Sequence, residues 1–187
     1  MNDQKNYFEY LRGRSLLGFL YRKLWLYPRL AREVSGRVLD VGCGIGDFMT
    51  YRPGTVGVDV STHTVDWCCQ RGLNAKLMEP DNLPFEDGSF ESVVLDNVLE
   101  HLSEPQALLA DIRRVLTPSG LLLVGVPGKK GYARDPDHKI FYGEADLVRV
   151  MNTAGLNKLR IFHMPLKSVW LADRLPQYCL YGVFVRS

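Results

Sequence analysis

Short apolar runs of strand length alternate along this chain with segments of helical period, and this alternation limits the fold more than any other feature. The runs fall at residues 37–41, 56–60, 75–78, 92–95 and 121–126. The first two are rich in valine and end at Gly or Asp, as strands buried on both faces of a parallel sheet do. Strands that alternate with helices form doubly wound sheets with right-handed crossovers. The sequence therefore predicts an α/β fold with a doubly wound, mostly parallel sheet.

Two further patterns complete this prediction. One helix is predicted to begin at Ser103 as N-cap and to stop at the turn of residues 118–120, and a second to span residues 144–152. The tail alternates differently, at residues 159–164 and 178–185, which indicates two antiparallel strands that close one edge. The sheet is therefore expected to have seven strands.

Size and composition narrow the class of protein. A chain of 187 residues with 46% apolar residues is the size of one domain and can bury a full core. The net charge of +2 gives no reason to expect a nucleic-acid partner, and no apolar run of about 18 residues is present to span a bilayer. The first residues lack the pattern of a signal peptide. The chain has four cysteines, and their spacing is typical neither of metal ligands nor of a disulfide framework; they are Cys43, Cys68, Cys69 and Cys179. We expect a cytoplasmic protein. No sequence feature indicates an oligomeric state.

A glycine-rich turn follows the first predicted strand. Glycines at positions 42, 44 and 46 let the chain turn sharply and let a ligand approach the backbone. Asp59 ends the second strand, nineteen residues beyond Asp40, where a carboxylate can accept both hydroxyls of a ribose. The alternatives are a tight turn without a ligand, and an Asp59 that caps the next helix. Together the two features favour a nucleoside-containing ligand.

Asp47 distinguishes between two such ligands. A dinucleotide-binding loop has Gly at this position, and a carboxylate there would lie beside a pyrophosphate that needs the positive end of the helix. S-adenosylmethionine contains no phosphate, so the repulsion is absent. The sequence therefore favours S-adenosylmethionine over NAD.

Four ordered blocks carry a resemblance to a known family. The run of residues 37–46 resembles the first motif of class I S-adenosylmethionine-dependent methyltransferases. Three more resemble the type 11 branch, which is similar to the methyltransferases of ubiquinone and menaquinone biosynthesis; they are residues 57–61, residues 82–90, and residues 98–102 with 116–120. The resemblance covers residues 36–165. It implies a Rossmann-like methyltransferase fold and methyl transfer to a small-molecule acceptor, for which we expect a hydroxyl of a sugar, phenol or lipid-linked precursor. A non-catalytic regulatory or assembly protein that binds the cofactor is the alternative.

The resemblance also implies a set of cofactor-binding residues. These are Asp40, Gly42, Cys43, Gly44, Gly46, Asp59, Val60, Glu79, Asp81, Asn82, Leu83, Asp96 and Asn97. Asp40 and the glycines are expected to hold the methionine portion and Asp59 the ribose. The family has Asp-Ala where this chain has Glu79-Pro80; Glu79 can still accept from adenine, but Pro80 has no N–H, so Asp81 is an alternative partner. Asp96 and Asn97 are expected to face the methyl group, or else are ordinary polar loop residues.

The predicted catalytic residues are Glu100, His101 and His138. In some relatives a Glu-His pair at this position lies in the active centre. In one quinone-biosynthesis group it helps to hold a metal ion, together with an acid three positions earlier. This chain has Asn97 there, so no metal is predicted. The alternatives are that Glu100 and His101 cap and orient the following helix, and that His138 is a structural residue of a lid.

The first 35 residues lie outside these motifs. The sequence predicts one domain over residues 1–187, with an N-terminal helical cap at 1–35 and a cofactor-binding core at 36–187. Aromatic and basic residues alternate in the cap, so a peripheral membrane contact or a lipid-linked substrate is an open alternative. Tyr10 and Arg14, one helical turn apart, are candidates to reach the cofactor or the acceptor.

Overall fold

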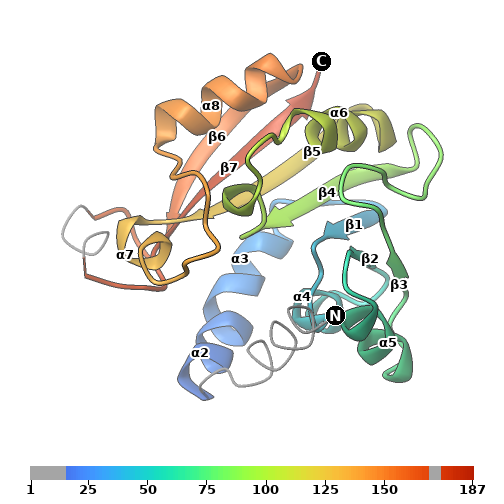
Figure 1. The fold of residues 1–187 in the computed structure, drawn as a ribbon, viewed down its shortest axis with the longest axis horizontal. Coiled ribbons are helices and arrows are strands. Elements are labelled where there is room, and N and C mark those ends of the chain that lie inside the picture. Colours follow the sequence, from blue (N-terminus) through green and yellow to red (C-terminus); the bar gives the residue numbers. More distant parts are fainter. Residues whose placement is uncertain (1–15, 169–173) are drawn as a thin grey trace.

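A seven-stranded sheet forms the centre of the computed structural model, which describes residues 16–168 and 174–187 (Figure 1). The strands are β1 (Val38–Val41), β2 (Val56–Asp59), β3 (Ala75–Leu77), β4 (Phe90–Asp96), β5 (Leu116–Pro127), β6 (Leu156–Met164) and β7 (Cys179–Arg186). Their order is β3-β2-β1-β4-β5-β7-β6. The first five are parallel, and β7 pairs antiparallel with both β5 and β6. The predicted doubly wound, mostly parallel sheet with an antiparallel pair at one edge is confirmed.

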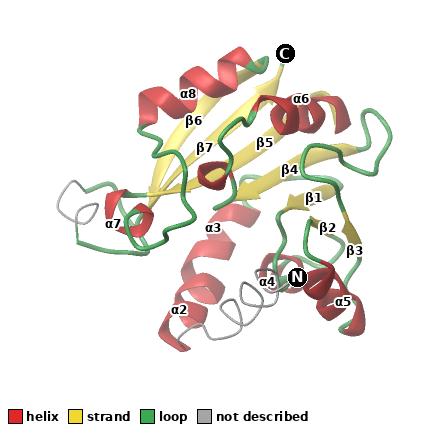
Figure 2. Cartoon of the chain, in the orientation of Figure 1, coloured by secondary structure: helices red, strands yellow, loops and turns green. Residues whose placement is uncertain are grey.

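Helices cover both faces of this sheet (Figures 1 and 2). They are α2 (Leu16–Tyr21), the π-helix η1 (Arg22–Leu26), α3 (Tyr27–Ala31), α4 (Asp47–Tyr51), α5 (Thr62–Gln70), the 3₁₀-helix η2 (Leu99–His101), α6 (Gln106–Val115), α7 (Lys129–Tyr132) and α8 (Glu144–Thr153). Helices α6 and α8 pack on one face, and α3 and α4 pack on the other. The carboxyl ends of the parallel strands therefore meet at one edge of a three-layer structure.

Neighbouring strand residues serve the two cores in turn. Leu39 and Leu122 face the core under α6 and α8, whereas Val38 and Leu123 face the core under α3 and α4. All four side chains are at most 1% exposed. Because side chains alternate along a strand and both faces are covered, the central strands are apolar at most positions, with Asp40 and Asp59 as exceptions near their carboxyl ends. This burial explains the apolar runs in the sequence.

The starts of α6 and β5 differ from the prediction. Helix α6 begins at Gln106 rather than at Ser103, with Pro105 at the N-cap position and no side-chain cap. The proline ring fixes φ in the helical range, at −76°, so the helix starts directly after it. Strand β5 begins at Leu116, which pairs with Phe90 ahead of the irregular turn that holds Ser119 at a φ of 63°.

The N-terminal segment is partly described, since residues 1–15 lie outside the description. Leu30 of α3 is fully buried against the sheet, together with Tyr27 and Leu26. Exposed apolar side chains precede them on α2 and η1: Leu16, Leu17, Phe19, Leu20, Leu24 and Trp25. The membrane contact stays a prediction, and Tyr10 and Arg14 fall in the undescribed segment. Among the described helices, none has the length and apolar character needed to cross a membrane.

Arg114 of α6 ties the loop between β3 and β4 to the helix. Its guanidinium donates to the carboxylates of Asp111 and Asp87 and to the carbonyls of Leu83 and Phe85. We expect Arg114→Ala to lower the free energy of unfolding by about 1–3 kcal/mol in urea titrations, because several charge-assisted hydrogen bonds are lost together. Arg149→Ala is the matched control: its pair with Asp146 is largely exposed and should contribute at most about 0.5 kcal/mol. Equal effects of the two substitutions would contradict this role of Arg114.

Candidate active site

The glycine-rich loop joins β1 to α4 at the carboxyl edge of the sheet. Gly42 has a φ of 74°, and a Cβ atom there would lie 2.4 Å from Cγ2 of Val98. Gly46 has a φ of 79° at the N-cap position of α4. Both positions require glycine, because other residues rarely adopt a positive φ and the space beside Gly42 is already filled. The predicted glycine-rich turn is thus a tight loop, in which Val98 packs directly against the backbone of Gly42 and Leu73 against that of Gly46.

Asp59 is buried at the end of β2, 3% exposed, and holds this loop in place. Its Oδ2 accepts from Gly44 N at 2.9 Å, and its Oδ1 accepts from Ser61 N at 2.9 Å. The residue at the N-cap of α5 is Ser61, whose Oγ accepts from Thr64 N. Asp59 is therefore not the N-cap of α5; instead, its carboxylate connects β2 to the glycine loop. Each carboxylate oxygen has a second lone pair with which to accept from a ligand hydroxyl.

Acidic side chains gather beneath the loop. Asp40 is 5% exposed, and burial raises the pKa of its carboxyl well above the usual value, with further contributions from the charges of Asp96 and Asp59. The carboxyl groups of Asp40, Asp59 and Asp96 give this region a negative potential that favours a cationic ligand. The ammonium and sulfonium groups of S-adenosylmethionine carry the matching charge.

The end of β4 carries the other polar residues predicted to face the methyl group. Asp96 accepts from the hydroxyl of Tyr181 at 2.9 Å and from Nδ2 of Asn97 at 2.9 Å. Asn97 is exposed and has a φ of 56°, a left-handed conformation that few non-glycine residues adopt. Its N–H donates to the carbonyl of Gly125, so the turn is fixed by β5. Tyr181 was not predicted, because it comes from β7, 85 residues away in the chain.

The turn after β3 holds the residues predicted to contact adenine. Glu79 and Asp81 are exposed there, and the N–H of Asn82 donates to the carbonyl of Glu79. Leu83 donates its N–H to Oδ2 of Asp111 at 2.6 Å and buries its side chain. The backbone N–H groups of Asn82 and Leu83 are thus engaged within the protein. Of the predicted cofactor residues after β2, Val60 is 48% exposed at the start of the neighbouring loop.

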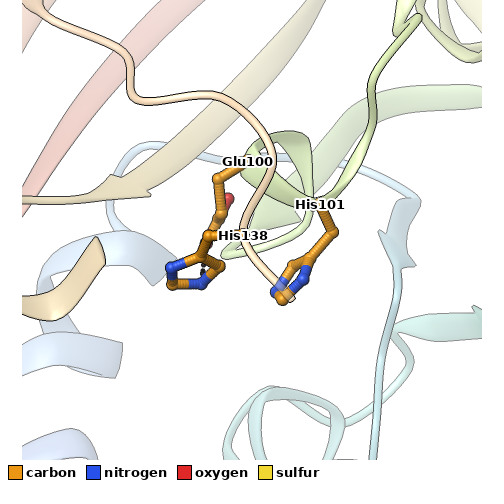
Figure 3. A group of neighbouring side chains, drawn as sticks. All are labelled: Glu100, His101 and His138. Atoms are coloured by element: carbon orange, nitrogen blue, oxygen red, sulfur yellow. Dashed lines mark ion pairs between the residues drawn. The ribbon is translucent and has the colours of Figure 1, made fainter. Parts of the chain in front are cut away.

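The three predicted catalytic residues come together, although His138 lies 37 positions after His101 (Figure 3). One ligand atom of each residue lies within 4.8 Å of the others. Nε2 of His138 is 3.7 Å from Oε1 of Glu100. The rings of His138 and His101 pack edge to face, with 4.6 Å between their centroids. Glu100 and His101 belong to η2, while His138 belongs to the loop between α7 and α8. The carbonyl of Glu100 joins these segments by accepting from Lys139 N and Ile140 N.

Burial changes the titration of this cluster. Glu100 is 1% exposed, and desolvation raises the pKa of its carboxyl to about 8, with smaller contributions from the charges of Asp96 and Asp135. Desolvation, and then the proximity of His138, lowers the pKa of His101. Near neutral pH His101 is therefore an uncharged imidazole, able to accept a proton. Neither η2 nor α6 has a side-chain cap, so the capping alternative for Glu100 and His101 finds no supporting contact.

The cluster lies next to the glycine loop. Val98, two residues before Glu100, packs against Gly42. Asp96 acts electrostatically on both Asp40 and Glu100, so it is near both groups. Such a site at the carboxyl edge of a doubly wound sheet is where ligands bind in this class of fold.

Known proteins resemble the chain in sequence and in structure. A family model described as a methyltransferase domain matches residues 39–124. A probable S-adenosylmethionine-dependent methyltransferase of Mycolicibacterium smegmatis is 30% identical over 172 residues, covering 80% of this chain and 67% of that protein. The human probable tRNA methyltransferase 9B is 33% identical over 115 residues, covering 57% of this chain and only 25% of that longer protein.

A solved structure agrees over nearly the whole length. It is a SAM-dependent methyltransferase of Thermotoga maritima, described as a possible histamine N-methyltransferase. The TM-score is 0.79 at 18% identity, and the match covers 98% of this chain and 97% of the other. At this identity the likeness bears on the fold alone.

Proposed function

Because the chain belongs to the class I S-adenosylmethionine-dependent methyltransferases, we propose that it methylates a hydroxyl of a small molecule beside Glu100, His101 and His138. S-adenosylmethionine is the methyl donor of this family. The single observation that carries the proposal is the convergence of these three side chains next to the glycine loop. Acceptors that are already nucleophilic, such as neutral amines, need no such cluster.

The residues on each side have separate tasks in this proposal. The cofactor side consists of the glycine loop, Asp40 and Asp59, which bind and orient the donor. Orientation is the main requirement, because the sulfonium methyl is electrophilic by itself, and well-aligned reactants gain about 7–11 kcal/mol. On the acceptor side, neutral His101 takes the hydroxyl proton as the oxygen attacks the methyl carbon. The bond between that carbon and sulfur breaks, and its electron pair stays on sulfur.

The cofactor side predicts selective binding. We expect S-adenosylmethionine and S-adenosylhomocysteine to bind with micromolar dissociation constants in calorimetry, and NAD not to bind. Asp47 lies in the first turn of α4, where its charge opposes a pyrophosphate at the helix N-terminus. Binding of NAD without binding of S-adenosylhomocysteine would contradict the placement of the loop.

A transfer assay tests the acceptor side. The purified enzyme is incubated with methyl-labelled S-adenosylmethionine and either a small-molecule extract or purified tRNA. The proposal predicts label in the small-molecule fraction, attached to an oxygen. Mild acid or base should not release this label, whereas it would release the label of a methyl ester. The likeness to a probable tRNA methyltransferase makes tRNA the second candidate acceptor. Label in the tRNA fraction alone would overturn the small-molecule proposal and identify tRNA as the acceptor.

A further inference from the structure

Glu100 presents a buried carboxylate without a hydrogen-bond donor. Among residues 16–168 and 174–187, neither of its carboxylate oxygens accepts a hydrogen bond, although the side chain is 1% exposed. The nearest basic atom recorded is Nε2 of His138 at 3.7 Å, beyond hydrogen-bond distance. A buried polar group without a partner is unfavourable, so native structures rarely keep one without a reason. The unpartnered carboxyl of Glu100 is therefore suited to a positively charged ligand.

The ring of His138 is oriented to serve the same ligand. Its Nδ1 is 2.8 Å from the carbonyl oxygen of Tyr132. A carbonyl only accepts, so Nδ1 carries a hydrogen, and Nε2 is the ring nitrogen on the side of Glu100, 3.7 Å from its Oε1. Histidines that bind metals are commonly held in this way, with the second ring N–H donated to a backbone carbonyl or a carboxylate. Nε2 of His138 and Oε1 of Glu100 thus face each other with no hydrogen bond between them.

We propose that Glu100, His101 and His138 bind a divalent transition-metal ion, for which Zn²⁺ is the best match. Two imidazoles and one carboxylate are a ligand set that Zn²⁺ accepts in sites with an open fourth position. Tetrahedral ligands at zinc distances lie about 3.4 Å apart. The separation of Glu100 and His138 is 3.7 Å, and all three ligand atoms lie within 4.8 Å. His101 is half-buried beside these two residues, and coordination requires a rotation of its side chain towards them.

The backbone keeps these ligands together. Lys139 N and Ile140 N donate to the carbonyl of Glu100 at 2.7 and 3.1 Å, next to His138. Asp135 adds a carboxylate 4.0 Å from Nε2 of His138, which makes the surroundings more favourable to a cation. The third ligand is thus a histidine from a distant loop. Sequence spacing alone does not predict such a ligand set.

The ion would act on the acceptor, and this role rests on the proposed function, whereas the site itself does not. An acceptor hydroxyl in the open fourth position loses its proton more readily, because a bound cation lowers the pKa of a coordinated oxygen. With the ion bound, His101 is one of its ligands, so the proton leaves to solvent instead of to His101. The oxygen forms the new bond to the methyl carbon, and the electron pair of the broken carbon–sulfur bond stays on S-adenosylhomocysteine. Zn²⁺ undergoes no redox change in this sequence.

Titration of the purified, metal-stripped protein with Zn²⁺, without S-adenosylmethionine, tests the site by calorimetry. We expect one ion per chain, and affinity at least about 10²-fold lower in Glu100→Gln and in His138→Ala. His63→Ala is the control, since it removes an exposed imidazole on α5 and should leave the affinity unchanged. Glu100→Gln preserves the shape of the side chain, so this variant should fold, and circular dichroism checks this. His101→Asn is a third ligand variant.

Absorption of the Co²⁺-substituted protein identifies the ligand type. Nitrogen and oxygen ligands predict visible bands without the near-ultraviolet charge-transfer band of thiolates. A thiolate band, absence of Zn²⁺ binding, or unchanged binding in Glu100→Gln and His138→Ala would each overturn the proposal. Full methyl transfer after metal removal would overturn the role of the ion in the reaction but leave the proposed function intact. Zn²⁺ binding in a protein that labels only tRNA would leave the site intact and overturn the proposed function.

Discussion

Asp59→Ala should weaken the binding of S-adenosylhomocysteine at least tenfold. In the proposed complex the Asp59 carboxylate accepts from the two ribose hydroxyls, and charge-assisted hydrogen bonds of this kind contribute roughly 1.5–3 kcal/mol each. The substitution also removes the acceptors for Gly44 N and Ser61 N, so the glycine loop loses its support. Calorimetry gives the affinity, and thermal unfolding without ligand gives the accompanying loss of stability.

The structure changes one part of this expectation. From its position at a strand end, Asp59 could be substituted without loss of the fold. However, Asp59 is buried and hydrogen-bonded, so the melting temperature should fall as well. Asp59→Asn retains one acceptor oxygen and should lie between wild type and Asp59→Ala in both measurements. Asp66→Ala removes an exposed carboxylate of α5 and is the matched control. Wild-type affinity in Asp59→Ala would show that Asp59 supports the loop without contacting the ribose.

Replacing the histidines of the cluster should lower turnover by about 10²-fold or more. His101→Gln removes the proposed proton acceptor. A general base of this kind contributes about 10²–10⁴-fold to the reaction rate. His138→Gln removes the neighbouring ring, and with it the ion if the metal is bound. Affinity for S-adenosylhomocysteine should change little in either variant, because both side chains are assigned to the acceptor. Turnover and cofactor affinity are measured on the same preparations.

Thermal stability separates this role from a structural one. The melting temperature of each variant is recorded with and without S-adenosylhomocysteine, and His63→Ala again serves as control. Loss of stability and of cofactor binding in both variants would mark the histidines as scaffold. Full activity in both would indicate an acceptor that is methylated by positioning alone.

The sequence was most informative where local chemistry determines local structure. The apolar runs predicted the central strands because both faces of the sheet are covered, and Gly42 and Gly46 predicted a turn that only glycine can form. The order of the blocks placed Asp59 at the end of β2 and Glu100 after β4, the two strands on either side of β1. These are short-range properties or general consequences of a parallel sheet.

Contacts between distant segments were not readable in this way. Nothing near His138 in the sequence indicates that its ring faces Glu100 or that the carbonyl of Tyr132 fixes its tautomer. The bond from Gly44 to Asp59 likewise depends on the register of β1 against β2. The start of α6 was misplaced because Ser103 has the chemistry of a cap, whereas Pro105 determines where the helix begins.

The position of a bound cofactor tests the central claim most directly. In a crystal structure with S-adenosylhomocysteine, the account predicts both ribose hydroxyls within hydrogen-bond distance of Asp59. The sulfur should point past Asp96 towards His101, which leaves room for a methyl group and an acceptor between them. A ligand bound away from the glycine loop, or a sulfur that faces away from Glu100, His101 and His138, would contradict it.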